Sequence, residues 1–422
     1  MTAGMNQARK CRMPVRSRRC LLGTMAVIAA WSAGFAGVAP SAVAADVQSK
    51  QWYLSAMHAE EMWKVTTGEG VKIAVIDSGV NPSTPSLKGQ VLKGFDATGA
   101  DGDEYDDYRG HGTTMAELIA GTGKGGGLKG LAPGVKIIPM RITDTEFQNG
   151  RSVNASDTGD AIRAAADSDA KIISMSSSSD FPDQREREAV EYAKSKGKLF
   201  FSAVGNNAKE GNKEQFPAAY PQVVGVAATD SGGKVSVYSQ HGSYVDIAAP
   251  GDGIPTWCNA KFQSYCDSSG GTSQATAITS AAAALIWSAH PDWTANQVLN
   301  VLFDTAGRGD WKKGTLSNYL GHGIIRPAVN ILKGKGDPGD PDISPLTKER
   351  TSGSPASSAS ASSQPGKGET DEKAGDTAMA GSTADAEKKD DNSRLGLILG
   401  GAAAVVVLGG GAFVLVRRRR AV

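Results

Sequence analysis

The sequence has few of the residues on which disulfide-rich folds and nucleic-acid-binding proteins depend. Its 422 residues contain only four cysteines, too few to hold together a disulfide-stapled mini-fold. Lysine and arginine exceed aspartate and glutamate by only one (45 − 44), which gives no sign of the basic surface that nucleic acids require. Apolar residues still make up 40% of the chain, so disorder throughout is excluded. The composition therefore predicts a globular protein with no nucleic-acid partner.

Residues 1–45 have the pattern of an export signal. A basic start is followed by an apolar run over 21–38 and by small residues at 42–44 that form an A-x-A-like cleavage site. We predict a signal peptide over 1–45 that is removed in the mature protein. A retained membrane anchor is the alternative to cleavage. The pair Arg18 and Arg19 leaves both the general secretory route and the twin-arginine route open.

The other end of the chain predicts a membrane span. Residues 395–416 carry no charge and are followed by four arginines at 417–420. At about 1.5 Å per residue such a helix reaches about 33 Å, enough for a hydrocarbon core of about 30 Å. The arginines indicate that residues 417–422 are a cytoplasmic basic tail. We therefore expect a single-pass protein of the cell membrane whose remaining chain is extracellular.

Between these ends the composition changes once more. Residues 336–394 consist largely of Gly, Pro, Ser, Ala and charged residues, which bury too little apolar surface to order a backbone. We predict a disordered linker over 336–394. One large domain, 46–335, is left.

The domain alternates short β-branched runs with alanine-rich stretches, which favours an α/β fold with a doubly wound, mostly parallel sheet and helices on both faces. The expected strands are 71–76, 135–142, 171–175, 198–204 and 223–227. The expected helices are 114–120, 157–168, 185–196 and 274–289. In such folds reactive groups gather at the carboxyl ends of the strands.

Four polar residues stand at such places. Asp77 ends the first strand, His111 lies between two glycines before a helix, Asn206 follows another strand, and Ser273 lies at the head of a helix. Each has an ordinary structural interpretation as well: a turn cap for Asp77, a structural histidine, a turn asparagine and a helix N-cap for Ser273.

Their order distinguishes them. Asp, then His, then Ser, with an Asn between His and Ser, is the chain order of the subtilisin triad. The neighbouring segments agree, among them AVIDSG at 74–79, GHGT at 110–113, AVGN at 203–206, DIAAPG at 246–251 and GTSQA at 271–275. Over 60–330 the chain resembles the subtilisin-like (S8) serine proteases, or subtilases. With its export signal, tether and anchor it also resembles the mycosins, which are associated with actinobacterial type VII secretion.

This resemblance implies roles for the four residues. Asp77, His111 and Ser273 would form the catalytic triad, and Asn206 with the Ser273 backbone N–H would bind the oxyanion. It also implies a substrate-binding edge strand made of Ser174, Met175, Ser176 and Ser177.

The chain departs from the family at a few positions. Thr114 stands where a second His is usual, and Thr276 and Ala277 stand where a Pro is usual. Ser177 and Ser178 replace an apolar residue and a Gly. Neither Thr114 nor the Thr276 and Ala277 pair supplies a proton or a hydrogen-bond donor to the expected reaction.

Other reactive groups are few. Cys258 and Cys266 are the only cysteines left after removal of the signal peptide, and outside the cell such a pair predicts a disulfide. No Cys or His cluster indicates a metal site, and we expect no cofactor. Five acidic residues over 101–107 form either a solvated loop or, as in many subtilases, a calcium loop.

Together these observations predict a membrane-anchored extracellular serine endopeptidase. It would hydrolyse the peptide bonds of a protein or peptide substrate through an acyl-enzyme intermediate, with the membrane and the type VII secretion machinery as the implied partners. The alternative is a catalytically idle subtilase fold that serves as a structural part of a secretion complex.

Overall fold

The computed structural model describes residues 44–144, 147, 157–267 and 270–351. Within them a seven-stranded sheet has the order β2-β3-β1-β4-β5-β6-β7, and each neighbouring pair is parallel. The predicted α/β fold with a parallel sheet is confirmed. Most of the predicted signal peptide, the predicted membrane helix 395–416 and the tail 417–422 lie outside the described residues. Among the helices that are described, none has the length and apolar character needed to cross a membrane.

The predicted elements are present, with bounds that differ by a few residues. The sheet consists of β1 (Lys72–Asp77), β2 (Phe95–Asp96), β3 (Lys136–Arg141), β4 (Ile172–Met175), β5 (Leu199–Ala203), β6 (Val224–Thr229) and β7 (Ile247–Pro250). A small hairpin is formed by β8 (Thr256–Trp257) and β9 (Tyr265–Cys266). The helices are α2 (Ala44–Ser49), α3 (Trp52–Ala56), α4 (Ala59–Met62), α5 (His111–Ala120), α7 (Thr158–Asp167), α8 (Gln184–Ser195), α9 (Thr272–Ala289), α10 (Ala295–Asp304) and α11 (Pro327–Ile331). Short 3₁₀ turns occur at Lys124–Gly126 and Ala208–Glu210.

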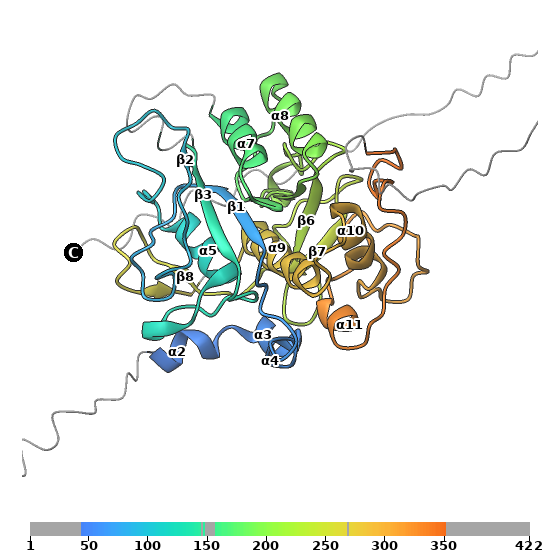
Figure 1. Ribbon diagram of the computed structural model, residues 1–422, viewed down its shortest axis with the longest axis horizontal. Coiled ribbons are helices and arrows are strands. Elements are labelled where there is room, and N and C mark those ends of the chain that lie inside the picture. Colours follow the sequence, from blue (N-terminus) through green and yellow to red (C-terminus); the bar gives the residue numbers. More distant parts are fainter. Residues whose placement is uncertain (1–43, 145–146, 148–156, 268–269, 352–422) are drawn as a thin grey trace, which may run out of the picture. The chain divides into compact units, whose positions relative to one another are not determined.

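Strand β1 shows why helices cover both faces of the sheet. Successive side chains of a strand point to opposite faces, so an uninterrupted apolar run must be buried on both. Ile73 and Val75 belong to the larger core, which includes the apolar residues of α5 and α9. Ala74 and Ile76 belong to a second core with α7 and α8. Figure 1 shows α7 and α8 side by side over one part of the sheet.

Helix α9 is almost entirely buried, from Thr272 to Trp287. It packs against β4, β5, β6 and β7 (Figure 1). Its side chains are mostly small, including four consecutive alanines at 281–284, and small side chains let a helix lie close to a sheet. This burial holds the first turn of α9 in a fixed place, near the turn that follows β5.

Residues 336–351 correct the predicted domain boundary, because the described chain continues as a strap along α10. The Pro341 carbonyl accepts hydrogen bonds from the side chains of Thr294 (3.0 Å) and Asn296 (2.8 Å), and the side chain of Leu346 packs against the larger core. The prediction that the linker begins at residue 336 is therefore wrong. The amino-acid composition of residues 336–351 does not predict this ordered strap, because side-chain donors at the start of α10 bind its backbone. Residues 352–394 of the predicted linker lie outside the described residues.

We expect Leu346→Ala to lower the free energy of unfolding by about 1–2 kcal/mol, because it removes apolar contact with the core. Chemical denaturation of the full chain measures this change. Leu316→Ala is the matched control, since that side chain is 53% exposed and its loss should change stability by less than about 0.5 kcal/mol. Equal effects of the two substitutions would contradict the packing of the strap.

Candidate active site

The carboxyl end of β1 carries Asp77, and the first residue of α5 is His111. Their side chains meet, with 2.7 Å between His111 Nδ1 and Asp77 Oδ1. Asp77 is only 5% exposed, and its Oδ1 also accepts a hydrogen bond from the Ser78 backbone N–H (2.8 Å). The carboxylate is therefore fixed, and it holds Nδ1 of the imidazole in the donor role, which leaves Nε2 as the proton acceptor.

The charge of Asp77 also changes the acidity of the imidazole. Burial alone would lower the pKa of His111, whereas the charge and the hydrogen bond of Asp77 and the charge of Asp107 raise it. The net result is a His111 pKa above its usual value. A histidine in this state is a stronger base toward a neighbouring hydroxyl.

Only a glycine at position 112 lets α5 come this close to β1. A Cβ added to Gly112 would lie 2.2 Å from the Gly79 carbonyl oxygen and 3.0 Å from Cβ of Asp77. Any larger residue would push the first turn of α5 away from the end of β1. The glycine that follows His111 is thus explained by the contact that the histidine makes with Asp77.

Ser273 is the second residue of α9, and Gly271 occupies the N-cap position. The interpretation of Ser273 as an N-cap is therefore wrong, and its hydroxyl is not used to close the helix end. The Oγ atom lies 3.5 Å from the carbonyl oxygen of Ser176, to which it donates a long hydrogen bond. This places the hydroxyl beside the chain segment that follows β4.

Asn206 lies in the turn after β5 and faces the first turn of α9. Its Oδ1 accepts hydrogen bonds from the backbone N–H (2.9 Å) and the hydroxyl (3.1 Å) of Thr272. The amide is thereby oriented with Nδ2 toward Gly271, where an added Cβ would lie 3.6 Å from it. The side-chain amide is thus held close to the N-terminus of the helix that carries Ser273.

The four residues predicted to bind substrate fall into two pairs. Ser176 and Ser177 line an open pocket of 210 Å³ together with Asp77 and His111. Ser174 and Met175 are instead buried inside β4, which pairs with β1 on one side and β5 on the other. The prediction of an edge strand is wrong for Ser174 and Met175, because their neighbours in the sheet already occupy both sides.

Comparisons with known proteins show the family to which the chain belongs. Residues 68–323 match the model of the Subtilase family. The chain belongs to the subtilase family of serine endopeptidases. Thermitase of Thermoactinomyces vulgaris is 33% identical over 279 residues, which cover 64% of this chain and 95% of thermitase. A thermophilic serine proteinase of Bacillus sp. (strain AK1) is 38% identical over 226 residues, which cover 53% of this chain. The match spans about half of that relative, 54% of its length.

Among solved structures the fold is similar to the MycP3 protease from the type VII (ESX-3) secretion system. That structure has a TM-score of 0.56 and 29% identity, and the match covers 67% of this chain and 88% of that one. The predicted resemblance to the mycosins is therefore confirmed.

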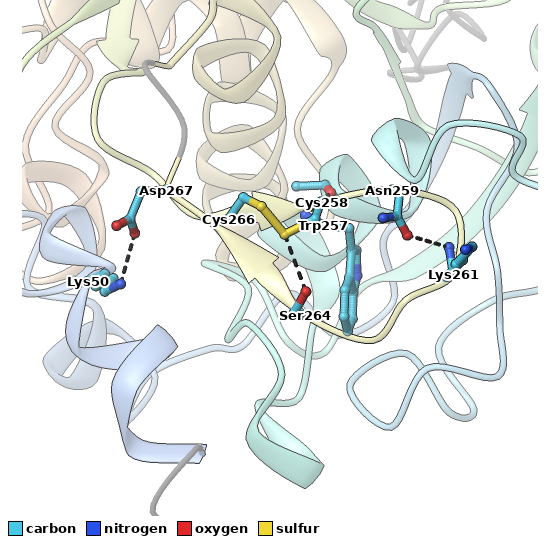
Figure 2. Close-up of a disulfide and its surroundings, with 9 residues drawn as sticks. Lys50, Trp257, Cys258, Asn259, Lys261, Ser264, Cys266 and Asp267 are labelled. Carbon is cyan, nitrogen blue, oxygen red and sulfur yellow. Dashed lines mark hydrogen bonds and ion pairs between the residues drawn. A yellow bond between two sulfur atoms is a disulfide. The ribbon is translucent and has the colours of Figure 1, made fainter.

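This subtilase carries a disulfide next to its histidine helix. Cys258 and Cys266 are joined across the β8–β9 hairpin, with their Cα atoms 5.0 Å apart. Figure 2 shows the disulfide beside Trp257, whose ring stacks on Tyr265 with 3.8 Å between ring centroids. The disulfide thus closes a compact, aromatic hairpin.

The hairpin is bonded to α5. The Trp257 backbone N–H donates to the hydroxyl of Thr114 (3.1 Å), and the Tyr265 hydroxyl donates to Glu117 Oε2 (2.6 Å). Thr114 replaces the second histidine that is usual in subtilases, and its hydroxyl serves here as a link to the hairpin. The disulfide loop therefore supports the helix that carries His111.

The acidic loop before His111 is not uniformly solvated. Glu104 and Asp107 are buried, so the interpretation of the whole loop as solvent-exposed is wrong for these two residues. In the part of the chain that the structure describes, no group of three or more His, Cys, Asp or Glu side chains is arranged to hold a metal ion. Asp107 instead accepts hydrogen bonds around the start of α5. The position of Asp107, four residues before His111, was the sequence signal for this role. It was missed because Asp107 is one of five acidic residues in the loop.

Burial raises the pKa of Glu117 to about 7, from 4.5 in an exposed carboxyl. Such a group binds more protons when folded, so its contribution to stability is complete below pH 4.5 and is lost as the pH rises through about 7. We expect Glu117→Gln to reduce the fall in unfolding free energy between about pH 5 and pH 8 by about 1–3 kcal/mol. Denaturation of the full chain across this range measures the change.

Glu60→Gln, at an exposed position of α4, is the matched control and should keep the wild-type pH dependence. Burial also raises the pKa of Asp246 and of Glu186 to about 7. Part of the pH dependence of the unfolding free energy should therefore remain in every variant. A Glu117→Gln curve that coincides with the wild-type curve would show that Glu117 is not protonated in the folded state.

Proposed function

We propose that the chain is a membrane-anchored serine endopeptidase whose catalytic triad is Asp77, His111 and Ser273. The observation that carries this proposal is the 2.7 Å contact between His111 and Asp77 in a pocket that Ser176 also lines. Because Ser273 Oγ contacts the Ser176 carbonyl, the nucleophile lies beside the same pocket. The family to which the chain belongs supports the same assignment.

Peptide-bond cleavage follows from these roles in two stages. Ser273 Oγ attacks the scissile carbonyl carbon while His111 Nε2 takes the hydroxyl proton, and Asp77 stabilises the resulting imidazolium. The tetrahedral intermediate collapses, His111 returns the proton to the leaving amine, and the acyl group remains on Ser273. Water, deprotonated by His111, then attacks the ester carbonyl. The bond to Ser273 Oγ breaks, His111 returns the proton to Oγ, and the second product leaves with a new carboxyl group.

The negative charge of the tetrahedral intermediate needs donors that are already in place. We assign this role to Asn206 Nδ2 and to the backbone N–H of Ser273 at the positive end of α9. Thr272 supports the assignment, since its two hydrogen bonds to Asn206 Oδ1 hold the amide with Nδ2 beside Gly271, at the N-terminus of α9.

The segment after β4 is the part of the site that an extended substrate would meet. Ser176 and Ser177 lie beyond the paired part of β4 and line the pocket beside His111. Tyr108, Arg109, Thr143 and Asp144 line the same pocket, so a polar substrate side chain fits it better than a large apolar one.

The triad and the oxyanion donor are tested with a fluorophosphonate probe and a peptide library on the full chain. We expect the probe to label the wild type and not Ser273→Ala. Asn206→Ala should lower kcat by about 10²–10³, the range known for the loss of this donor in a subtilisin. The neighbouring Asn207→Ala should leave kcat nearly unchanged. A folded wild-type chain that the probe does not label would refute catalysis and favour the idle structural role.

The proposed location is the cell membrane, with the catalytic domain outside. Its support is the predicted signal peptide 1–45, the predicted helix 395–416 and the predicted cytoplasmic tail 417–422. Association with a type VII secretion machinery is part of the proposal, and its support is the similarity to the MycP3 protease from the type VII (ESX-3) secretion system.

Protease treatment of intact cells tests the topology. We expect an added protease to cut within residues 352–394 and release the domain from cells that are not permeabilised, because only the tail 417–422 is predicted to be inside. Cleavage that appears only after permeabilisation would show that the orientation is reversed.

A further inference from the structure

We propose that Asp107 is a positioning residue of this site: its carboxylate joins the helix of His111 to the turn that follows Asp77. The inference rests on the proposed function and adds a residue that lies outside the triad. Asp107 is 6% exposed, and its carboxylate accepts hydrogen bonds from five donors on two different elements. No other side chain of the acidic loop joins these two elements in the described structure.

On the helix side, Asp107 replaces a helix cap. The N-cap position of α5 is Gly110, which has no side chain to accept from the first backbone N–H groups. Asp107 Oδ1 accepts from the backbone N–H of Gly110 (2.7 Å) and of Arg109 (3.0 Å). Its Oδ2 accepts from the backbone N–H (2.9 Å) and the hydroxyl (2.7 Å) of Thr113. These bonds fix the first turn of α5, and with it the position of the His111 backbone.

On the strand side, the same carboxylate binds Ser78. The Ser78 hydroxyl lies 2.8 Å from Asp107 Oδ1 and 3.2 Å from Asp77 Oδ1, so its hydrogen points to the nearer Asp107. The same hydroxyl accepts from the backbone N–H of Gly112 (3.1 Å). Ser78 follows Asp77 directly and therefore connects the triad aspartate to α5 through Asp107.

Asp107 also contributes negative charge near the imidazole. The charged groups that face His111 are Asp77 from β1, Asp107 and Arg109 from the loop before α5, and Asp144 from the loop after β3. Asp77 and Asp107 raise the pKa of His111, and Arg109 lowers it. Asp144 forms an ion pair with Arg109. Loss of the Asp107 charge should therefore lower the pKa of His111.

The substitution Asp107→Asn separates positioning from simple stability. An amide offers one acceptor oxygen in place of two and turns an NH₂ group toward existing donors, so the two elements lose part of their connection. Asp106→Asn is the matched control, because it removes the same charge one residue away, and the exposed Asp106 carboxylate accepts from the Asp103 backbone N–H rather than from α5.

The test is the rate of fluorophosphonate labelling of Ser273 across pH in the full chain. Asp107→Asn should slow labelling by about 10- to 100-fold, the effect expected of a misplaced catalytic group. It should also move the acid limb of the rate to lower pH, because His111 loses a negative neighbour. Asp106→Asn should stay within about twofold of the wild type. Wild-type rates and an unmoved limb in Asp107→Asn, or an equal shift in Asp106→Asn, would overturn the proposal.

Two further measurements make every result decisive. Circular dichroism shows whether Asp107→Asn folds. If it does not fold, Ser78→Ala is used instead, because it removes the link on the strand side and should slow labelling by about 3- to 10-fold. A wild-type labelling rate for Ser78→Ala would overturn the proposal. If the wild type itself is not labelled, the proposed catalysis is refuted. NMR titration of His111 in the isotope-labelled chain then decides, since Asp107→Asn must lower the pKa of His111 and Asp106→Asn must not.

Discussion

The hydrogen bond between Asp77 and His111 is the contact on which the candidate site depends. It requires the side chains of the last residue of a buried strand and the first residue of a helix to meet, with 2.7 Å between Asp77 Oδ1 and His111 Nδ1. A side chain at position 112 would prevent that approach, and the carboxylate of Asp107 holds the two elements together from the other side. The geometry of the imidazole is thus set by backbone positions as much as by the histidine itself.

The same principle applies to Ser273, the proposed nucleophile. Ser273 and His111 both lie in the first turn of a helix whose body is packed inside the protein. Several of the backbone N–H groups at these helix starts are bonded to neighbouring side chains, which hold the first turn in place, while the buried body prevents the helix from shifting. This arrangement provides preorganised donors at little entropic cost during the reaction. Helix α5 has additional support from the hairpin, through Thr114 and Glu117.

Five strands of the seven-stranded sheet were predicted because they are apolar on both faces, whereas β2 and β7 were not predicted. β1, β3, β4, β5 and β6 lie within about two residues of the predicted ranges, as expected when burial alone identifies a strand. The errors concern polar residues whose environment depends on distant parts of the chain. Ser174 was assigned to substrate because its sequence does not show that β1 and β5 lie on either side of it. The strap was assigned to the linker because its partners lie on α10.

The sequence by itself determined the fold class, the family and the order of Asp77, His111, Asn206 and Ser273, since apolar periodicity and short glycine-flanked motifs are local properties of the chain. The tertiary structure alone decided which of the polar residues meet. Asp107 has the same description by composition as its exposed neighbours in the acidic loop. Four of its five donors come from the following residues 109–113, and the packing of α5 against β1 adds the fifth, the Ser78 hydroxyl. The link between Asp107 and the turn after Asp77 therefore depends on tertiary structure, because Ser78 and Asp107 are 29 positions apart in the chain and only the folded chain brings them together.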